Sequence, residues 1–138
     1  MNFKNNIATT REQSERLLAL GVKPETADMH YFSAPTLKHD IMKVTESRFL
    51  ETGFRDDGST PAWSLSRLLE MMPRSIEQTN RPNADLDINS DDTYWFITYE
   101  ELGYEVKHQV MKRDLFDAVI DMIAWLIDNG CFNKDLLR

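Results

Sequence analysis

The feature that most constrains the fold is an aromatic, β-branched stretch followed within a few residues by an alternating one. Residues 94–99 read Tyr-Trp-Phe-Ile-Thr-Tyr, side chains that are enriched in β-strands. In residues 104–110, every second side chain is aromatic, aliphatic or imidazole, and those between are polar. With Gly103 in the link, the two stretches predict a β-hairpin whose second strand has one solvated face.

Directly after this hairpin, residues 114–129 carry the pattern of an amphipathic helix. Asp114 is placed to cap the first turn, and Gly130 suits the left-handed position that ends such a helix. The apolar residues cover nearly half of the helix circumference, which is wide enough to pack across a sheet. They are Leu115, Phe116, Val119, Ile120, Met122, Ile123, Leu126 and Ile127.

The first part of the chain predicts one helix and two strands. Thr10 and Gln13 have the spacing of a capping box, so a helix is expected to run from there until Gly21 closes it. Residues 29–32 and 41–45 are short runs rich in aromatic and β-branched residues, and we interpret both as strands.

The middle of the chain predicts a short helix between two loops. Residues 54–61 contain a turn-prone Asp-Gly pair, and residues 74–92 are polar, so both are expected to be loops. Between them, apolar residues recur at helical spacing over residues 61–73. With Ser64 as the cap, Trp63 takes the position of a hydrophobic staple and is interpreted as an anchor rather than a binding group.

The elements therefore run helix, strand, strand, helix, strand, strand, helix. This order predicts an α+β fold, with a small, mainly antiparallel sheet and about three helices packed on one face. Residues 1–138 are expected to form a single domain, because chains commonly split only beyond about 250 residues. A cytoplasmic protein without membrane contact is expected, because no apolar run approaches roughly 18 residues and residues 1–6 lack a secretory signal's apolar region.

The net charge of −7 indicates which partners the surface favours. A negative surface repels the phosphates of nucleic acid, so direct nucleic-acid binding is not expected. The excess lies in residues 70–138, which hold 14 acidic and seven basic side chains, whereas residues 1–69 hold nine of each. The acidic half is either a solvated surface or an acidic face for a basic protein partner.

The C-terminal helix offers the candidate binding surface. Its aspartates line the side opposite the apolar face, and Trp125 lies at their margin. An amphipathic aromatic beside a carboxylate row suits a basic partner, with the indole supplying buried area and the carboxylates orientation. The alternative is that Asp114 caps the helix, Asp117 favours its positive end and the others keep the face soluble. The candidate protein-binding residues are Asp114, Asp117, Asp121, Trp125 and Asp128.

One segment has part of a metal-binding pattern. Residues 85–92 place oxygen side chains at alternate positions, as in the first half of a calcium-binding EF-hand loop. The second half does not match, because Ser90 stands where the loop needs glycine and Phe96 where it needs a bidentate glutamate. We therefore expect a solvated loop, with no metal and no cofactor.

No pattern for catalysis is present in the sequence. His30, His39 and His108 lie far apart without paired spacing, and His108 falls in the apolar row of its strand, which favours a packed histidine. Glu100 and Glu101 are expected to adjoin in a turn and to point apart, unlike the opposed catalytic carboxylates of a glycosidase. No glycine-rich phosphate loop occurs. The single cysteine, Cys131, forms no internal disulfide, and no basic residue adjoins it in the sequence.

Three parts of the chain resemble a known family. They are residues 61–73, residues 8–14 together with 24–29, and residues 122–130, which contain a Trp-Leu-Ile run and an Asn-Gly pair. These segments look like a family of small bacterial proteins of unknown function that often lie in prophage-like or mobile elements. The resemblance implies a bacterial, intracellular accessory protein and favours a role in host or phage protein interaction. It implies no catalytic residues.

Three classes of function stay open. The favoured interpretation is a non-enzymatic protein-interaction module with a basic partner; the alternatives are an acidic inhibitor that mimics nucleic acid and an enzyme of unknown reaction. A mimic needs one continuous acidic face, so residues 85–92 would have to lie beside the aspartates of residues 114–128. An enzyme needs a concave pocket with convergent polar groups.

Overall fold

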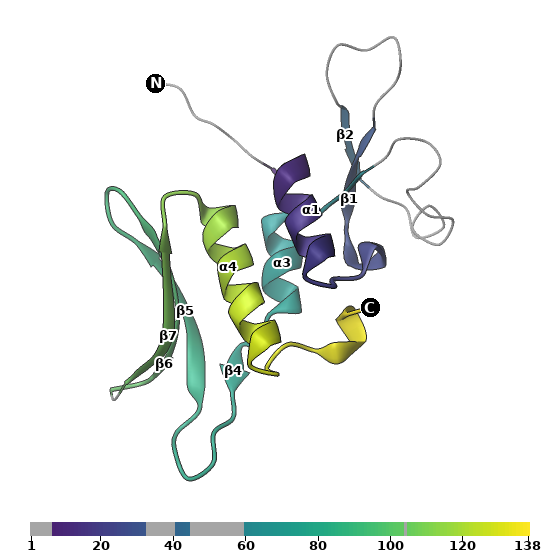
Figure 1. Ribbon diagram of the computed structural model, residues 1–138. Coiled ribbons are helices and arrows are strands. Elements are labelled where there is room, and N and C mark those ends of the chain that lie inside the picture. Colours follow the sequence, from purple (N-terminus) through teal and green to yellow (C-terminus); the bar gives the residue numbers. More distant parts are fainter. Residues whose placement is uncertain (1–6, 33–40, 45–59, 104) are drawn as a thin grey trace. The chain divides into compact units, whose positions relative to one another are not determined.

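The computed structural model describes residues 7–32, 41–44, 60–103 and 105–138 (Figure 1). The fold is α+β, as predicted, and its strands form two antiparallel sheets. The chain divides into two compact units. The first unit holds Met1–Leu68 and Lys134–Arg138, and the second unit holds Leu69–Asn133. The single domain expected from the sequence stays a prediction.

In the first unit, three short strands form an antiparallel sheet in the order β2-β1-β3. The strands expected over residues 29–32 and 41–45 are confirmed. The third strand was missed, because its Pro61 is a weak strand signal, although proline is tolerated on an edge strand such as this one. The expected loop over residues 54–59 lies outside the described residues. The elements are α1 (Arg11–Ala19), a 3-10 turn (Pro24–Thr26), β1 (Met29–Phe32), β2 (Ile41–Val44), β3 (Thr60–Ala62) and a second 3-10 turn (Lys134–Leu136).

The predicted capping box at the start of α1 is confirmed. The Thr10 hydroxyl accepts a hydrogen bond from the backbone N–H of Gln13 at 3.1 Å, and the Gln13 side chain accepts one from the Thr10 N–H at 3.0 Å. At the other end, Gly21 has φ 95°, the left-handed conformation that favours glycine. Local hydrogen bonds therefore fix both ends of this helix.

The C-terminal residues return to the first unit. The backbone N–H of Lys23 donates to the carbonyl of Leu136 at 2.9 Å, and that of Arg138 donates to the carbonyl of Gly21 at 2.7 Å. Val22 and Leu137 form an isolated antiparallel bridge. The segment that follows α1 is thus paired with residues more than a hundred positions away in the chain.

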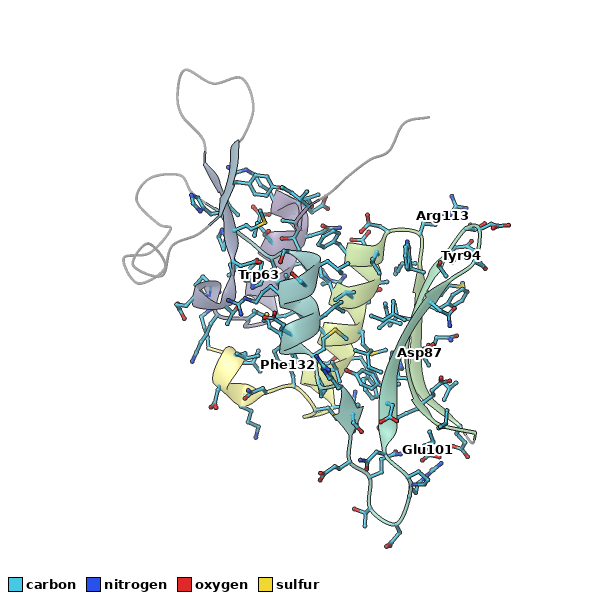
Figure 2. All side chains as sticks on the ribbon, turned by 180° about the vertical axis from the view of Figure 1, so that it is seen from behind. Trp63, Asp87, Tyr94, Glu101, Arg113 and Phe132 are labelled. Carbon is cyan, nitrogen blue, oxygen red and sulfur yellow. The ribbon has the colours of Figure 1, made fainter. Side chains whose placement is uncertain are left out.

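Trp63 anchors the end of β3, as the sequence predicts (Figure 2). Its side chain is fully buried, and the indole N–H donates to the Thr26 hydroxyl at 2.9 Å. Helix α3 (Leu65–Met71) follows at once. The Ser64 hydroxyl accepts from the Arg67 N–H at 3.2 Å, and the Asp28 carboxylate accepts from the Ser64 N–H at 2.8 Å. Ser64 is therefore the helix cap.

The second unit is a four-stranded antiparallel sheet in the order β4-β5-β6-β7, with α4 along one face (Figure 1). The predicted hairpin is confirmed as β6 and β7, and the predicted helix as α4. Asp114 caps α4 by accepting from the Asp117 N–H at 2.9 Å, and Gly130 has φ 68°. The elements are β4 (Ser75–Ile76), β5 (Ala84–Ser90), β6 (Trp95–Glu101), β7 (Val106–Lys112) and α4 (Leu115–Asp128).

The long loop expected over residues 74–92 is wrong. Residues 84–90 form a full-length strand that pairs with β6 along its whole length. Its alternate aspartates lowered the apparent strand propensity, yet Leu86 and Ile88 between them keep a period of two. Pairing with the aromatic β6, a non-local interaction, overrides the weak local preference.

None of the helices in the described residues has both the length and the hydropathy that crossing a membrane requires.

The core of the second unit can be tested at Ile123, which lies in α4 and is fully buried. Replacing Ile123 with alanine should reduce the free energy of unfolding by about 2 to 5 kcal/mol, because truncation leaves a cavity. Leu102→Ala is the matched control, because the Leu102 side chain is 83% exposed and its loss should change little. Chemical denaturation followed by circular dichroism measures both, and equal midpoints would contradict the assignment of this helix face.

Candidate protein-binding surface

The sheet of the second unit has two faces of different chemistry, because successive residues of a strand point to opposite sides. Tyr99 of β6 is paired with His108 of β7. The Trp125 ring of α4 stacks on the His108 ring at 4.5 Å between centroids and lies 6.4 Å from the Tyr99 ring. Tyr99 and His108 therefore lie on the face of the sheet that α4 covers. Their neighbours in the strands, such as Thr98, lie on the opposite face, which we call the outer face.

Three carboxylates lie together at one end of the outer face. Asp85 of β5 and Glu100 of β6 are directly paired across the strands, and Asp87 is the next outer-face residue of β5 (Figure 2). Directly opposed side chains have their Cβ atoms about 4.5 to 5.5 Å apart, and like charges in that position are destabilising. Asp85 accepts a hydrogen bond from the Ser75 hydroxyl at 2.7 Å, and Asp87 accepts one from the Asn89 amide at 3.0 Å.

Within the part of the chain that the structure describes, no salt bridge engages Asp85, Asp87 or Glu100. The salt bridges of the second unit engage other carboxylates: Arg81 binds Glu101 and Glu105, and Lys112 binds Asp121. Lys107, at the β-bulge opposite Glu100, is the neighbouring basic residue, and its ammonium donates to the Gln78 amide oxygen at 3.1 Å. The three carboxylates are therefore a cluster of negative charge on the outer face that has no direct ion pair among the described residues.

The other end of the outer face is apolar. Phe96 of β6 is half-buried and pairs with Met111 of β7, whose side chain is 51% exposed. Between the two ends, the Gln109 amide donates to the buried Thr98 hydroxyl at 3.0 Å, which satisfies the centre of the face. The outer face thus runs from an apolar pair, across a neutral polar pair, to the carboxylate trio.

The aspartate stripe predicted on α4 is largely engaged within its own unit. Asp114 caps the helix, and the Asp121 carboxylate lies 3.3 Å from the Lys112 ammonium. Asp117 supplies the capped N–H in the first turn, while Asp128 is exposed at the last residue of the helix. Asp114 and Asp121 therefore have structural roles within the unit. The role of the aspartate stripe in binding a partner stays a prediction.

Trp125 lies against the sheet, rather than standing free beside the aspartates. Its ring is nearly parallel to that of His108, with 4° between their planes. The interpretation of His108 as a packed histidine is confirmed by this contact. Burial lowers the pKa of His108 below its usual value, because desolvation disfavours the imidazolium form.

Burial of His108 should make the stability of the fold depend on pH. Because the pKa of His108 is lower in the folded protein than in the unfolded chain, its stabilising contribution is full above the unfolded pKa, about 6.5, and is lost as the pH falls through the folded value. Denaturation at pH 7.5 and pH 5 should show a loss of stability in the wild type that is smaller in His108→Gln. An equal loss in both proteins would show that His108 is not the titrating group.

A second polar cluster fixes the turn of the β6–β7 hairpin. The Glu101 carboxylate is buried and lies 2.7 Å from Arg81 Nε, and it also accepts from the Gln78 amide at 2.7 Å. Arg81 reaches Glu105 at 2.9 Å as well. The hydrogen bond from Arg81 is the main cause of the lowered pKa of Glu101. The cluster therefore ties the β4–β5 connection to the hairpin turn. The turn expected at Glu100 and Glu101 is wrong, because both residues lie in β6. Their carboxylates point apart as predicted, since successive residues of a strand face opposite sides.

Acid should loosen this cluster. A carboxylate with a lowered pKa stabilises the fold above its unfolded pKa, and that contribution disappears as the pH falls through the folded value. Glu101→Gln should therefore be less stable than the wild type at pH 7, with the difference shrinking as the pH falls below about 4. Glu105→Gln is the matched control, because Glu105 contacts the same Arg81 from an exposed position and should cost less. A pH-independent difference for Glu101→Gln would contradict the argument.

Residues 85–92 do not form a loop that could wrap a cation. Asp85 and Asp87 lie in extended β5, where residues two apart are separated by about 7 Å along the strand. Among the described residues, no group of three or more His, Cys, Asp or Glu side chains is arranged to hold a metal ion. Cys131 is half-buried, and its thiol lies 3.5 Å from the carbonyl oxygen of Asn129.

Sequence reasoning missed the outer face as a surface, because it assigned β5 to a loop. The available signal was the alternation of Asp85, Asp87 and Asn89 with Leu86 and Ile88, which is the pattern of a half-buried strand.

Comparisons with protein-family models, with curated proteins and with solved structures found no match to this chain.

Proposed function

We propose that the protein is a non-enzymatic protein-interaction module that binds a basic protein partner. The observation that carries the proposal is the Asp85–Glu100 pair on the outer face, with Asp87 beside it and no salt bridge to any of the three among the described residues. Opposed like charges cost stability in a sheet. Fold stability alone would therefore favour neutral residues here, and a basic partner supplies the direct ion pairs that these carboxylates lack within the described residues.

The arrangement of the carboxylates favours a protein partner over mimicry of nucleic acid. A mimic needs the acidic residues of β5 and of α4 on one continuous face. Asp85 and Asp87 point to the outer face, whereas α4 covers the other face of the same sheet. The two sets of carboxylates are therefore separated by the sheet.

The titratable groups of the second unit whose pKa values are shifted also favour binding over catalysis. The pKa of Tyr99 is raised by burial, and its hydroxyl donates to the carbonyl of Pro73 at 2.6 Å. The pKa shifts of His108 and Glu101 have packing and ion-pair causes, described above. Each group thus has a structural role. A bacterial, cytoplasmic accessory protein remains part of this proposal.

The proposal predicts that removing the charges of Asp85 and Glu100 raises the stability of the fold but weakens binding of the partner. In the double variant Asp85→Asn, Glu100→Gln, the free energy of unfolding should be about 0.2 to 1 kcal/mol higher than in the wild type, because the repulsion between the two carboxylates is removed. It should also bind its partner more weakly. The control double variant Glu77→Gln, Asp92→Asn removes the same charge from exposed positions outside the trio.

Binding can be followed before the partner has been identified. A photo-reactive residue replaces Gln109, which is exposed on the outer face, or Glu12, which is exposed on α1 as a position control. Cell extract is then irradiated at low and high salt. We expect protein adducts from position 109 that decrease with salt and with the Asp85→Asn, Glu100→Gln variant. Equal adducts from both positions, adducts with nucleic acid alone, or no adducts would contradict the proposal.

A further inference from the structure

We infer that the outer face binds a basic amphipathic helix of the partner, with an apolar residue on the Phe96–Met111 pair and basic residues on Asp85, Asp87 and Glu100. This inference rests on the proposed function and specifies the shape and register of the partner segment. It joins the two ends of the face, one apolar and one acidic, into a single site.

A helix fits this face better than an extended segment does. A sheet face presents side chains, and the hydrogen-bonding groups of its strands are used within the sheet. A lone strand laid on it would leave its own buried N–H and C=O groups without partners, whereas a helix satisfies these groups internally. Extended peptides join sheets at their edges instead. The opposite face of the same sheet already packs a helix, α4.

The strand geometry sets the spacing that the helix must match. Phe96 and Glu100 are four residues apart on β6, so the apolar pair and the acidic pair are separated by about 13 Å. In a helix, positions seven and eleven residues from an apolar residue lie on its own face, at about 10 and 16 Å along the axis. Basic residues at those positions therefore bracket the carboxylates when the apolar residue rests on Met111.

Charge selects a basic partner over a second copy of this chain. When two outer faces meet, each set of Asp85, Asp87 and Glu100 lies against either the same carboxylates or the apolar pair of the other copy, and neither arrangement supplies a cation. Burying such carboxylates without cations is costly. Lysine or arginine side chains provide the opposite charge and can also lay their alkyl stems along the apolar pair.

Two synthetic helical peptides of identical composition test the register. Each carries leucines at one position and one turn later, in an alanine and glutamine background. The matched peptide has lysines seven and eleven positions after the first leucine, and the control peptide has them five and nine positions after it, on the opposite helix face. Amide chemical-shift titrations of the full chain measure affinity and location together. We expect the matched peptide to bind at least about threefold more tightly and to shift Thr98, Gln109 and Met111.

Single variants then test each end of the site. Met111→Gln and Glu100→Gln should each weaken binding of the matched peptide about two- to fivefold, whereas Leu102→Gln and Glu77→Gln, at exposed positions elsewhere, should not. Equal affinity for both peptides, or shifts confined to α4, would overturn the inference while leaving a basic partner in place. Concentration-dependent dimerisation through the outer face would identify a second copy instead. Absence of binding by either peptide, together with absence of protein adducts from position 109, would overturn both the inference and the proposed function.

Discussion

The second unit depends on strand β6, which pairs with β5 on one side and with β7 on the other. Its alternating residues build both faces at once. Ile97 and Tyr99 are buried on the side of α4, while Phe96, Thr98 and Glu100 run along the outer face from its apolar end to its acidic end. A shift of one residue in the register would exchange these sets, so packing beneath α4 also holds the outer face in place.

Elements whose determinants are local in sequence were predictable. The capping box of α1, the Ser64 cap of α3, and the Asp114 and Gly130 ends of α4 are each encoded within a few residues. The β6–β7 hairpin was equally clear. What sequence reasoning missed depends on partners distant in the chain: β3 is stabilised by β1, and β5 by β6. The division of the strands between two sheets has the same origin, because local patterns do not specify which strands pair.

The candidate site shows the same distinction. Sequence periodicity predicted one stripe for the aspartates of α4, but it could not show that Trp125 stacks on His108 or that Asp121 reaches Lys112. The grouping of Asp85, Asp87 and Glu100 could not be predicted, because it depends on the pairing of two strands. Asp85 and Glu100 are fifteen positions apart and meet only through the pairing of β5 with β6. A polar stretch with a strand period can thus carry a surface that composition alone assigns to solvent.

The pairing of residues 134–138 with the segment after α1 constrains the order in which the chain can fold. The first unit takes its last pieces of backbone pairing, at Lys23 and Val22, from residues that follow the whole second unit in sequence. During synthesis, the second unit can therefore form while the first still lacks its closing segment. Pairing of residues 134–138 with the first unit closes a long loop, and the entropic cost of that closure is lower once the intervening residues have folded into a compact unit. Folding of the second unit therefore favours completion of the first.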